Sequence, residues 1–168
     1  MQNLQDKEIL ATVTPSPARR MVGVAMLALL GGLLIYLALA TPILSLSLRL
    51  MLLGFGVLVL WLANKMRKAT AHGVVLTEDG LFSTDGQMLL AIDDMHAVVR
   101  GTFALKPSNG FSVLANTRLT RGWAPGVWWR YGKRMGVGGV TAASQAKFMA
   151  EILAARLNQR SNQPESRN

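Results

Sequence analysis

The sequence is poor in the residue types that carry most enzyme and metal chemistry. It contains no cysteine, two histidines, and nine acidic residues against 18 lysines and arginines. The absence of cysteine excludes disulfide bonds, thiolate nucleophiles, and zinc or iron–sulfur sites built on cysteine; it fits a reducing cytosol without requiring one. The shortage of acids leaves a formal net charge of +9, which favours an anionic neighbour such as lipid headgroups or nucleic acid.

Catalytic motifs are missing as well. The chain has neither the G-x-x-x-x-G-K pattern of a phosphate-binding loop nor the G-x-S-x-G pattern of a nucleophile elbow. Asp93, Asp94 and His96 form a single short cluster, which without further ligands is a weak metal signal. We therefore predict no catalytic, cofactor-binding or metal-binding residues and no enzymatic activity. The alternative is an enzyme that uses Asp94 and His96, which would share one face of a strand.

What the chain does contain is two long apolar runs near its start. Residues 21–40 carry no charge, and a helix of about 20 residues spans the hydrocarbon core of a bilayer. A second run at about 46–64 carries one charge, Arg49, close enough to its start to reach the headgroups. The short link around Thr41 and Pro42 predicts a tight antiparallel hairpin of two transmembrane helices.

Small residues within the two runs are candidates for close helix packing. Ala28 and Gly32 form a small-xxx-small pair in the first run, and Gly54 and Gly56 remove side-chain bulk from the second, which would allow the helices to approach closely. The alternative is ordinary lipid-exposed composition, because glycine is frequent in membrane helices.

The flanking charges predict the orientation of the hairpin. Two arginines precede the first run and three cations follow the second, whereas the link between them is close only to Arg49. Because lysine and arginine collect on the cytoplasmic side, we expect a multi-pass protein of the inner membrane with both termini in the cytoplasm. Trp61 fits the aromatic belt at that side. The flanking cations are Arg19, Arg20, Lys65, Arg67 and Lys68.

A cleaved signal peptide is the competing interpretation of the N-terminus. Arg19 and Arg20, an apolar run and the residues 38–40 (ALA) resemble its three parts. The apolar run is longer than the usual 7–15 residues, acids precede it at Asp6 and Glu8, and a second apolar run follows at once. We therefore expect the first run to remain as a membrane helix.

Downstream of the apolar runs the pattern changes to short strands separated by turns. Glycine-containing turns at 78–80, 85–86 and 132–133 separate runs of β-forming residues, and residues 106–110 also predict a turn. Residues 141–157 then show helical spacing, with Thr141 as a candidate N-cap and an apolar stripe through Ala146, Met149 and Leu153. The expected strands are 71–77, 81–84, 87–92, 95–105, 111–117, 126–131 and 134–138.

This order predicts an α+β membrane protein: a helical hairpin followed by an antiparallel β-barrel or sandwich capped by an amphipathic C-terminal helix. A sheet of about seven strands curls to avoid exposed edges, and the helix covers the open end. The expected organisation is an N-terminal cytoplasmic segment at 1–20, the hairpin at 21–64, a cytoplasmic domain at 65–157 and a disordered tail at 158–168.

Three segments of the domain resemble the bacterial type of pleckstrin-homology-like (PH-like) domain that follows two N-terminal transmembrane helices. They read LTEDGLFSTDG at 76–86, AIDDMHAVV at 91–99 and GVGGVTAASQAKFMAEILAARL at 136–157. The resemblance implies a PH-like fold and no catalytic site. Eukaryotic relatives grip inositide phosphates with basic residues in the first hairpin, where this chain has Glu78 and Asp79, so we expect no specific inositide binding.

The densest aromatic and basic segment is 128–134 (WWRYGKR). Strand alternation places Val127, Trp129 and Tyr131 on one face and Trp128 and Arg130 on the other. We expect the first set to fill the core, while Trp128, Arg130, Lys133 and Arg134 point outward. Such a face is either a solvated rim of the core or a contact surface for protein, membrane or single-stranded nucleic acid.

Together these features predict a non-enzymatic, membrane-anchored interaction module, such as an accessory, assembly or regulatory subunit of a membrane protein complex. The alternative is a peripheral sensor of anionic lipid or envelope stress that uses its basic face. Expected partners are anionic lipid headgroups and another integral membrane protein, whereas nucleic acid is not expected. The candidate interaction surface consists of Lys65, Arg67, Lys68, Trp128, Arg130, Lys133 and Arg134.

Overall fold

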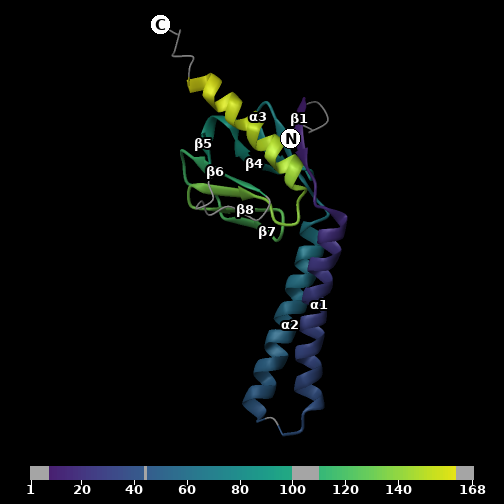
Figure 1. The fold of residues 1–168 in the computed structure, drawn as a ribbon. Coiled ribbons are helices and arrows are strands. Elements are labelled where there is room, and N and C mark those ends of the chain that lie inside the picture. Colours follow the sequence, from purple (N-terminus) through teal and green to yellow (C-terminus); the bar gives the residue numbers. More distant parts are fainter. Residues whose placement is uncertain (1–7, 44, 100–109, 162–168) are drawn as a thin grey trace.

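The structure is a computed structural model that describes residues 8–43, 45–99 and 110–161. Two helices project from a domain of two sheets and one helix (Figure 1). The elements in chain order are β1 (Ile9–Val13), α1 (Pro17–Ala40), α2 (Leu46–Ala69), β2 (Val74–Thr77), β3 (Gly80–Ser83), β4 (Met88–Ala91), the 3-10 helix η2 (Ile92–Asp94), β5 (Met95–Val99), β6 (Phe111–Ala115), β7 (Gly122–Ala124), β8 (Trp128–Tyr131), β9 (Arg134–Val137) and α3 (Ala143–Ser161).

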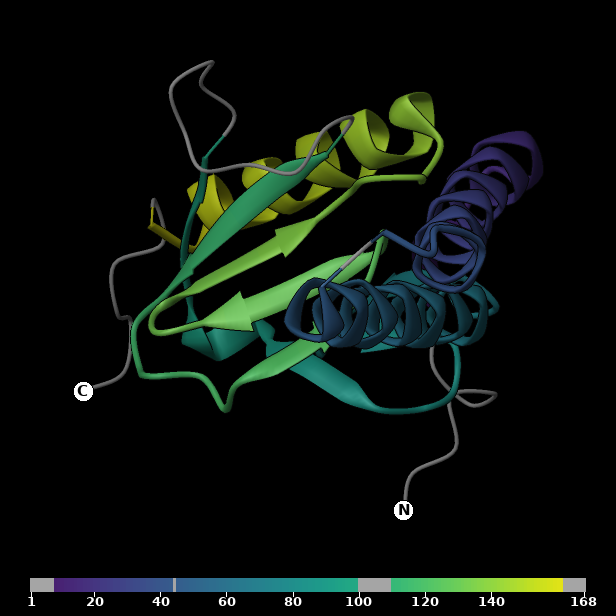
Figure 2. The same cartoon turned by 90° about the horizontal axis from the view of Figure 1, so that it is seen from below.

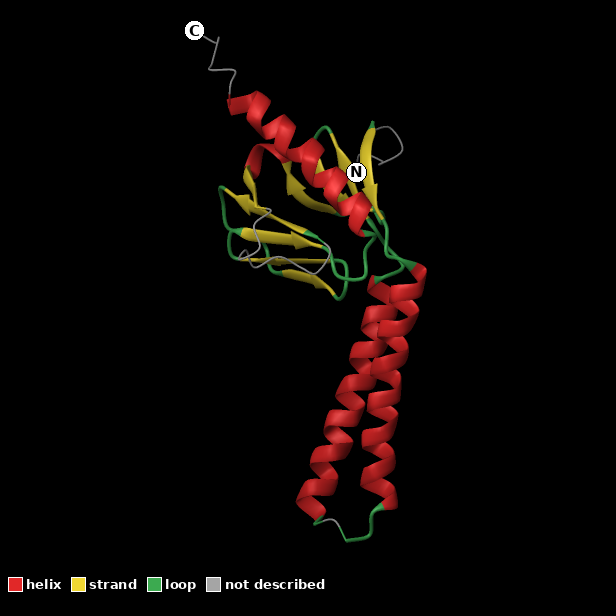
Figure 3. Cartoon of the chain, viewed as in Figure 1, coloured by secondary structure: helices red, strands yellow, loops and turns green. Residues whose placement is uncertain are grey.

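Helices α1 and α2 lie side by side as an antiparallel hairpin, as predicted (Figure 3). Each has 24 residues and is long and apolar enough to cross a membrane. In the most apolar window of each helix only 11% of the residues are buried, whereas the core helix of a water-soluble protein buries its apolar stripe. Large side chains such as Leu29 and Met26 are 73% and 68% exposed. The hairpin therefore presents an apolar surface on nearly all sides.

The two helices touch at Gly31 and Gly56. A Cβ on Gly31 would lie 3.1 Å from the Gly56 carbonyl oxygen, and the reverse distance is also 3.1 Å. Of the four candidates for helix packing, Gly56 lies in this contact, whereas Gly32 and Gly54 have no atom of the facing helix within 4 Å of their Cβ positions, and Ala28 is exposed. Successive helical residues are rotated by about 100°, so a shift of one residue moves the contact to another face.

The strands form two antiparallel sheets with the orders β1-β2-β3-β4 and β5-β6-β9-β8-β7. Among the described residues no strand pair joins the sheets, so they do not close into a barrel and the sandwich is the form observed. Two strands were not expected. β1 pairs with β2 from within the N-terminal segment, and β7 pairs with β8 from within the irregular stretch before residue 125. Of the strand predicted at 95–105, the structure describes β5 (Met95–Val99), and residues 100–105 lie outside the described residues, as does most of the predicted turn at 106–110.

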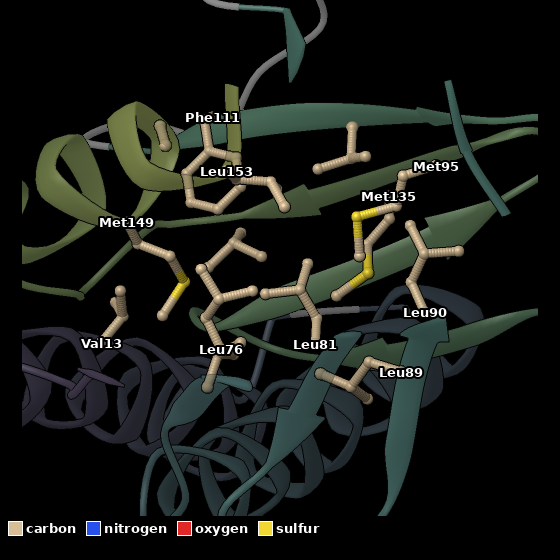
Figure 4. Packing of buried hydrophobic residues seen from close by; sticks show 14 of the residues in the cluster. Val13, Leu76, Leu81, Leu89, Leu90, Met95, Phe111, Met135, Met149 and Leu153 are labelled. Carbon is tan, nitrogen blue, oxygen red and sulfur yellow. The ribbon is translucent and has the colours of Figure 1, made fainter. Parts of the chain in front are cut away.

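The core lies between the two sheets and α3 (Figure 4). Val13, Leu76 and Leu81 from the first sheet and Met135 from the second are fully buried there. The predicted stripe of α3 is confirmed, because Ala146, Met149, Ala150 and Leu153 complete the same core. α3 packs on the outer strands β1 and β5 and so covers one of the two openings between the sheets.

The ends of α3 differ from the prediction. α3 begins at Ala143, two residues after the predicted N-cap Thr141, and Thr141 forms an isolated bridge with Pro15. At its other end α3 continues to Ser161, so residues 158–161 are helical rather than part of a disordered tail, and the remainder of that tail lies outside the described residues.

Candidate functional site

The predicted cations gather where the hairpin meets the sheets. Arg19 and Arg20 lie in the first turn of α1, and Lys65, Arg67 and Lys68 lie in the last turns of the antiparallel α2. Arg49 lies at the opposite end of the hairpin, where its Nη2 donates to the Thr41 carbonyl oxygen at 3.3 Å. The hairpin therefore has five cations at the end next to the domain and one near its far end.

Lys65 lies between two tryptophan rings at this junction. Its Nζ is 5.0 Å from the centroid of Trp61, one turn earlier on α2, and 5.0 Å from the centroid of Trp123 on β7. Cations at this distance are attracted by the negative face of an indole ring. Trp61 and Trp123 are 55% and 51% exposed, which suits the boundary between hydrocarbon and water, where tryptophan is enriched. The sequence analysis identified Lys65 and Trp61 but missed Trp123, because β7 was not expected.

Hydrogen bonds tie the domain to the hairpin at the same place. Ser16 N donates to the Val140 carbonyl oxygen at 2.8 Å, and Arg19 Nη1 donates to the Thr141 carbonyl oxygen at 3.0 Å. The end of α2 also packs on the domain: a Cβ on Gly126 would lie 3.3 Å from Met66 Cε and 3.5 Å from Thr70 Cγ2. The entry to α1 and the exit from α2 are thus both attached to the sandwich, so the domain has a defined orientation relative to the hairpin.

Arg20 and Arg67 border an open hollow of about 470 Å³ beside this attachment. Arg20 Nη2 donates to the Arg67 carbonyl oxygen at 3.2 Å and so links the two helices. Arg67 is exposed, and its own Nη2 reaches Asn64 Oδ1 at 3.4 Å. The other lining residues are Pro15, Pro17, Met21, Val24 and Ala25.

Val127 is buried in the core as predicted, but the orientation predicted for residues 128–131 is reversed in the structure. Trp128 and Arg130 lie opposite Val137 and Met135 on the neighbouring strand, and both of these are fully buried. Directly paired residues of antiparallel strands share a face, so Trp128 and Arg130 point inward. Arg130 Nη1 donates to the Leu89 carbonyl oxygen at 2.9 Å, and burial lowers the pKa of this guanidinium from its ordinary value.

The outer face of the second sheet carries the other aromatic set. Trp129 lies over Gly136, where a Cβ would come within 2.3 Å of the indole Nε1. Trp123 is paired with Trp129, and Tyr131, paired with Arg134, is 62% exposed. Seen from the side toward which the hairpin projects, the strands of this sheet are visible, with α2 in front of part of them (Figure 2).

Lys133 and Arg134, both exposed, lie in and after the turn between β8 and β9. Lys133 belongs to a second hollow of about 440 Å³ that Arg118, Arg121 and Tyr131 also line. The Arg121 guanidinium carbon lies 4.9 Å from the centroid of the Tyr131 ring. Arg118 and Arg121 were missed by the sequence analysis, because isolated arginines in an irregular stretch show no periodic pattern.

The acidic cluster forms structural contacts. Asp94 lies in η2 rather than on a strand, so it does not share a strand face with His96, which is exposed. Asp93 pairs with Arg160 at 2.7 Å, and Thr117 Oγ1 donates to Asp94 Oδ1 at 3.3 Å. Within the described ranges no group of three or more histidine, cysteine, aspartate or glutamate side chains is arranged to hold a metal ion.

Fold and site together define a class: an α+β chain in which an apolar helical hairpin carries a two-sheet domain at its cationic end. Comparison with protein-family models, curated proteins and solved structures finds no significant match for this chain.

Proposed function

We propose that this chain is a non-enzymatic, membrane-anchored interaction module. In this proposal α1 and α2 cross the inner membrane, both termini lie in the cytoplasm, and the domain binds another integral membrane protein as an accessory, assembly or regulatory subunit. The observation that carries the proposal is the apolar exposed hairpin with its cations gathered at the end that holds the domain. Burial of apolar surface in lipid contributes about 25 cal/mol per Å², so a hairpin with this surface is far more stable in a bilayer than in water.

Two measurements test the anchor. The full-length chain should stay with the membrane pellet after carbonate extraction, and reporters fused to either end should be active only in the cytoplasm. Recovery of the intact chain in the supernatant would contradict the membrane anchor, and reporter activity on the opposite side would contradict the orientation.

Purification in mild detergent tests the partner. A second membrane protein should co-purify in a fixed ratio, and substitution of residues on the outer face of the second sheet, such as Tyr131→Ala, should weaken its recovery. A matched change at exposed Phe148 on α3 should leave recovery unaltered. Repeated isolation of the chain alone from native membranes would count against an accessory subunit.

The domain is, in this proposal, a PH-like fold. The support is its antiparallel two-sheet sandwich, with a C-terminal helix packed into one opening between the sheets. β1 is then an addition that extends the first sheet. An experimental structure tests this relationship: strand order and connectivity that fail to superpose on PH-like domains would refute it.

A second candidate function is the sensing of anionic lipid by direct binding. It is favoured by the hollow that Arg118, Arg121 and Lys133 line beside the exposed Tyr131. In nanodiscs, hydrogen exchange of residues 118–133 should slow when phosphatidylglycerol replaces phosphatidylcholine, and high salt should reverse the effect. A hydrogen-exchange rate of residues 118–133 that changes with neither lipid charge nor salt concentration would exclude this function. The full chain is required, because a fragment starting at residue 65 would lack β1.

A further inference from the structure

The hollow beside Arg20 and Arg67 changes from cationic to apolar along the axis of the hairpin. Arg20 lies at its start, and Met21, Val24 and Ala25 follow on α1. At 1.5 Å per residue these apolar side chains lie about 1.5 to 8 Å further along the helix than Arg20. A phospholipid has its charged and apolar parts in the same order, with a phosphate followed by acyl chains.

The depth of the hollow matches that of a lipid headgroup if the hairpin spans a bilayer. Arg20 directly precedes the charge-free run 21–40, and Arg67 lies just beyond the second apolar run. Both guanidinium groups then lie at the headgroup level, while Met21, Val24 and Ala25 face the beginning of the acyl region.

Neither arginine is neutralised within the described part of the chain, where no carboxylate pairs with Arg20 or Arg67. The contacts that the two side chains make are to the Arg67 carbonyl oxygen and the Asn64 side-chain oxygen. Guanidinium groups bind phosphate oxygens through parallel N–H donors, so a phosphodiester is the complementary ligand.

We propose that this hollow is a binding site for one anionic phospholipid. The phosphate binds between Arg20 and Arg67, and one acyl chain lies along Met21, Val24 and Ala25. This inference rests on the proposed membrane insertion. It differs from general attraction of the cationic end to an anionic surface, because it depends on particular residues and on the shape of the hollow.

Native mass spectrometry of the full chain in detergent, with dioleoyl phosphatidylglycerol or dioleoyl phosphatidylcholine added, tests the site. The chain should bind one phosphatidylglycerol more strongly than phosphatidylcholine. Arg67→Gln should weaken that binding about fivefold, and the double variant with Arg20→Gln should weaken it ~25-fold, as expected for about 1 kcal/mol per cation. Arg67→Gln keeps the backbone carbonyl that Arg20 binds, so the link between the helices survives.

Lys68→Gln is the matched control, because it removes the same charge from the next residue of α2, which does not line the hollow. It should leave the affinity within twofold of the parent. Ala25→Trp should fill the hollow and weaken binding without a change of charge. Equal loss in Arg67→Gln and Lys68→Gln, or equal binding of the two lipids, would overturn the proposal. Carbonate extraction separates this failure from failure of the anchor, since a lipid site can be absent from a chain that still stays in the pellet.

Discussion

Arg130 on β8 bridges to Leu89 on β4, with its Nη1 2.9 Å from the Leu89 carbonyl oxygen. The two strands belong to different sheets, and α3 covers the opposite opening between these sheets. One charged hydrogen bond therefore joins the sheets on the side that α3 leaves uncovered. The guanidinium also lies 5.0 Å from the centroid of the Trp128 ring, which shields it from water.

Replacement of Arg130 by methionine should destabilise the domain by about 1–3 kcal/mol. The change keeps much of the apolar stem but leaves the Leu89 carbonyl oxygen without this donor, and hydrogen bonds to charged groups contribute about 1.5–3 kcal/mol. Denaturant unfolding in detergent, followed by tryptophan fluorescence, measures the difference. Arg134→Met, at an exposed position of the next strand, should change stability by less than about 0.5 kcal/mol. A more stable Arg130→Met variant would mean that the buried charge costs more than its bond contributes.

Val13→Asp should unfold the domain, whereas Ile9→Asp should not. Both residues lie on β1, but Val13 is fully buried between the sheets and Ile9 is 55% exposed. An unpaired carboxylate at Val13 should cost at least about 3 kcal/mol, and surface changes are usually within about 0.5 kcal/mol. Thermal unfolding followed by circular dichroism measures both. Similar midpoints for the two variants would show that β1 does not belong to the core.

Leucine substitutions of four glycines should separate the two faces of the hairpin. Gly31→Leu and Gly56→Leu should each lower stability by about 1–3 kcal/mol, the usual cost of overpacking, because their Cβ positions lie 2.8 Å and 2.6 Å from side-chain atoms of the facing helix. Gly32→Leu and Gly54→Leu have open space and should be neutral or slightly stabilising, since leucine favours the helix. The midpoint of thermal unfolding in detergent gives the ranking, and equal effects at all four positions would refute the contact.

A double-mutant cycle should detect coupling between Lys65 and Trp123. With Lys65→Met and Trp123→Leu, the interaction energy should be about 0.5–2 kcal/mol, as for cation–π pairs at partly exposed sites. The same cycle with Lys68→Met should give a value near zero, because Lys68 is exposed and has no such ring contact within the described residues. The cycle is measured from the free energies of unfolding, in detergent, of the parent, the two single variants and the double variant. Equal coupling for both lysines would point to a general charge effect.

The hairpin and most strands could be predicted because their signals are local. A charge-free run such as 21–40 is most stable as a helix in lipid, where its backbone groups pair with one another. Glycine turns such as Asp85-Gly86 separate β-forming segments whatever the tertiary structure is. β1 could not be predicted in this way. Its five residues acquire a partner only when β2, more than 60 positions later, folds back beside them.

Alternation along β8 was predicted correctly, but the choice of inner face was wrong. A strand pattern of period 2 has two faces, and a local pattern does not say which one meets the core. Here Gly136 leaves room for Trp129 on the outside, while Leu89 offers a buried acceptor for Arg130 on the inside. The helix contact was missed for the same reason. Gly31 and Gly32 are neighbours of the same residue type, but only Gly31 faces α2.

The sequence by itself determined that two apolar helices precede a basic, strand-rich domain with a C-terminal amphipathic helix, because hydrophobic period and run length are properties of neighbouring residues. Only the tertiary structure decided that residues 9–13 complete the first sheet, that Arg130 points inward, that Trp123 meets Lys65, and that Arg20 and Arg67 share a hollow. Each of these depends on groups far apart in the chain, whose approach is set by the packing of the whole core.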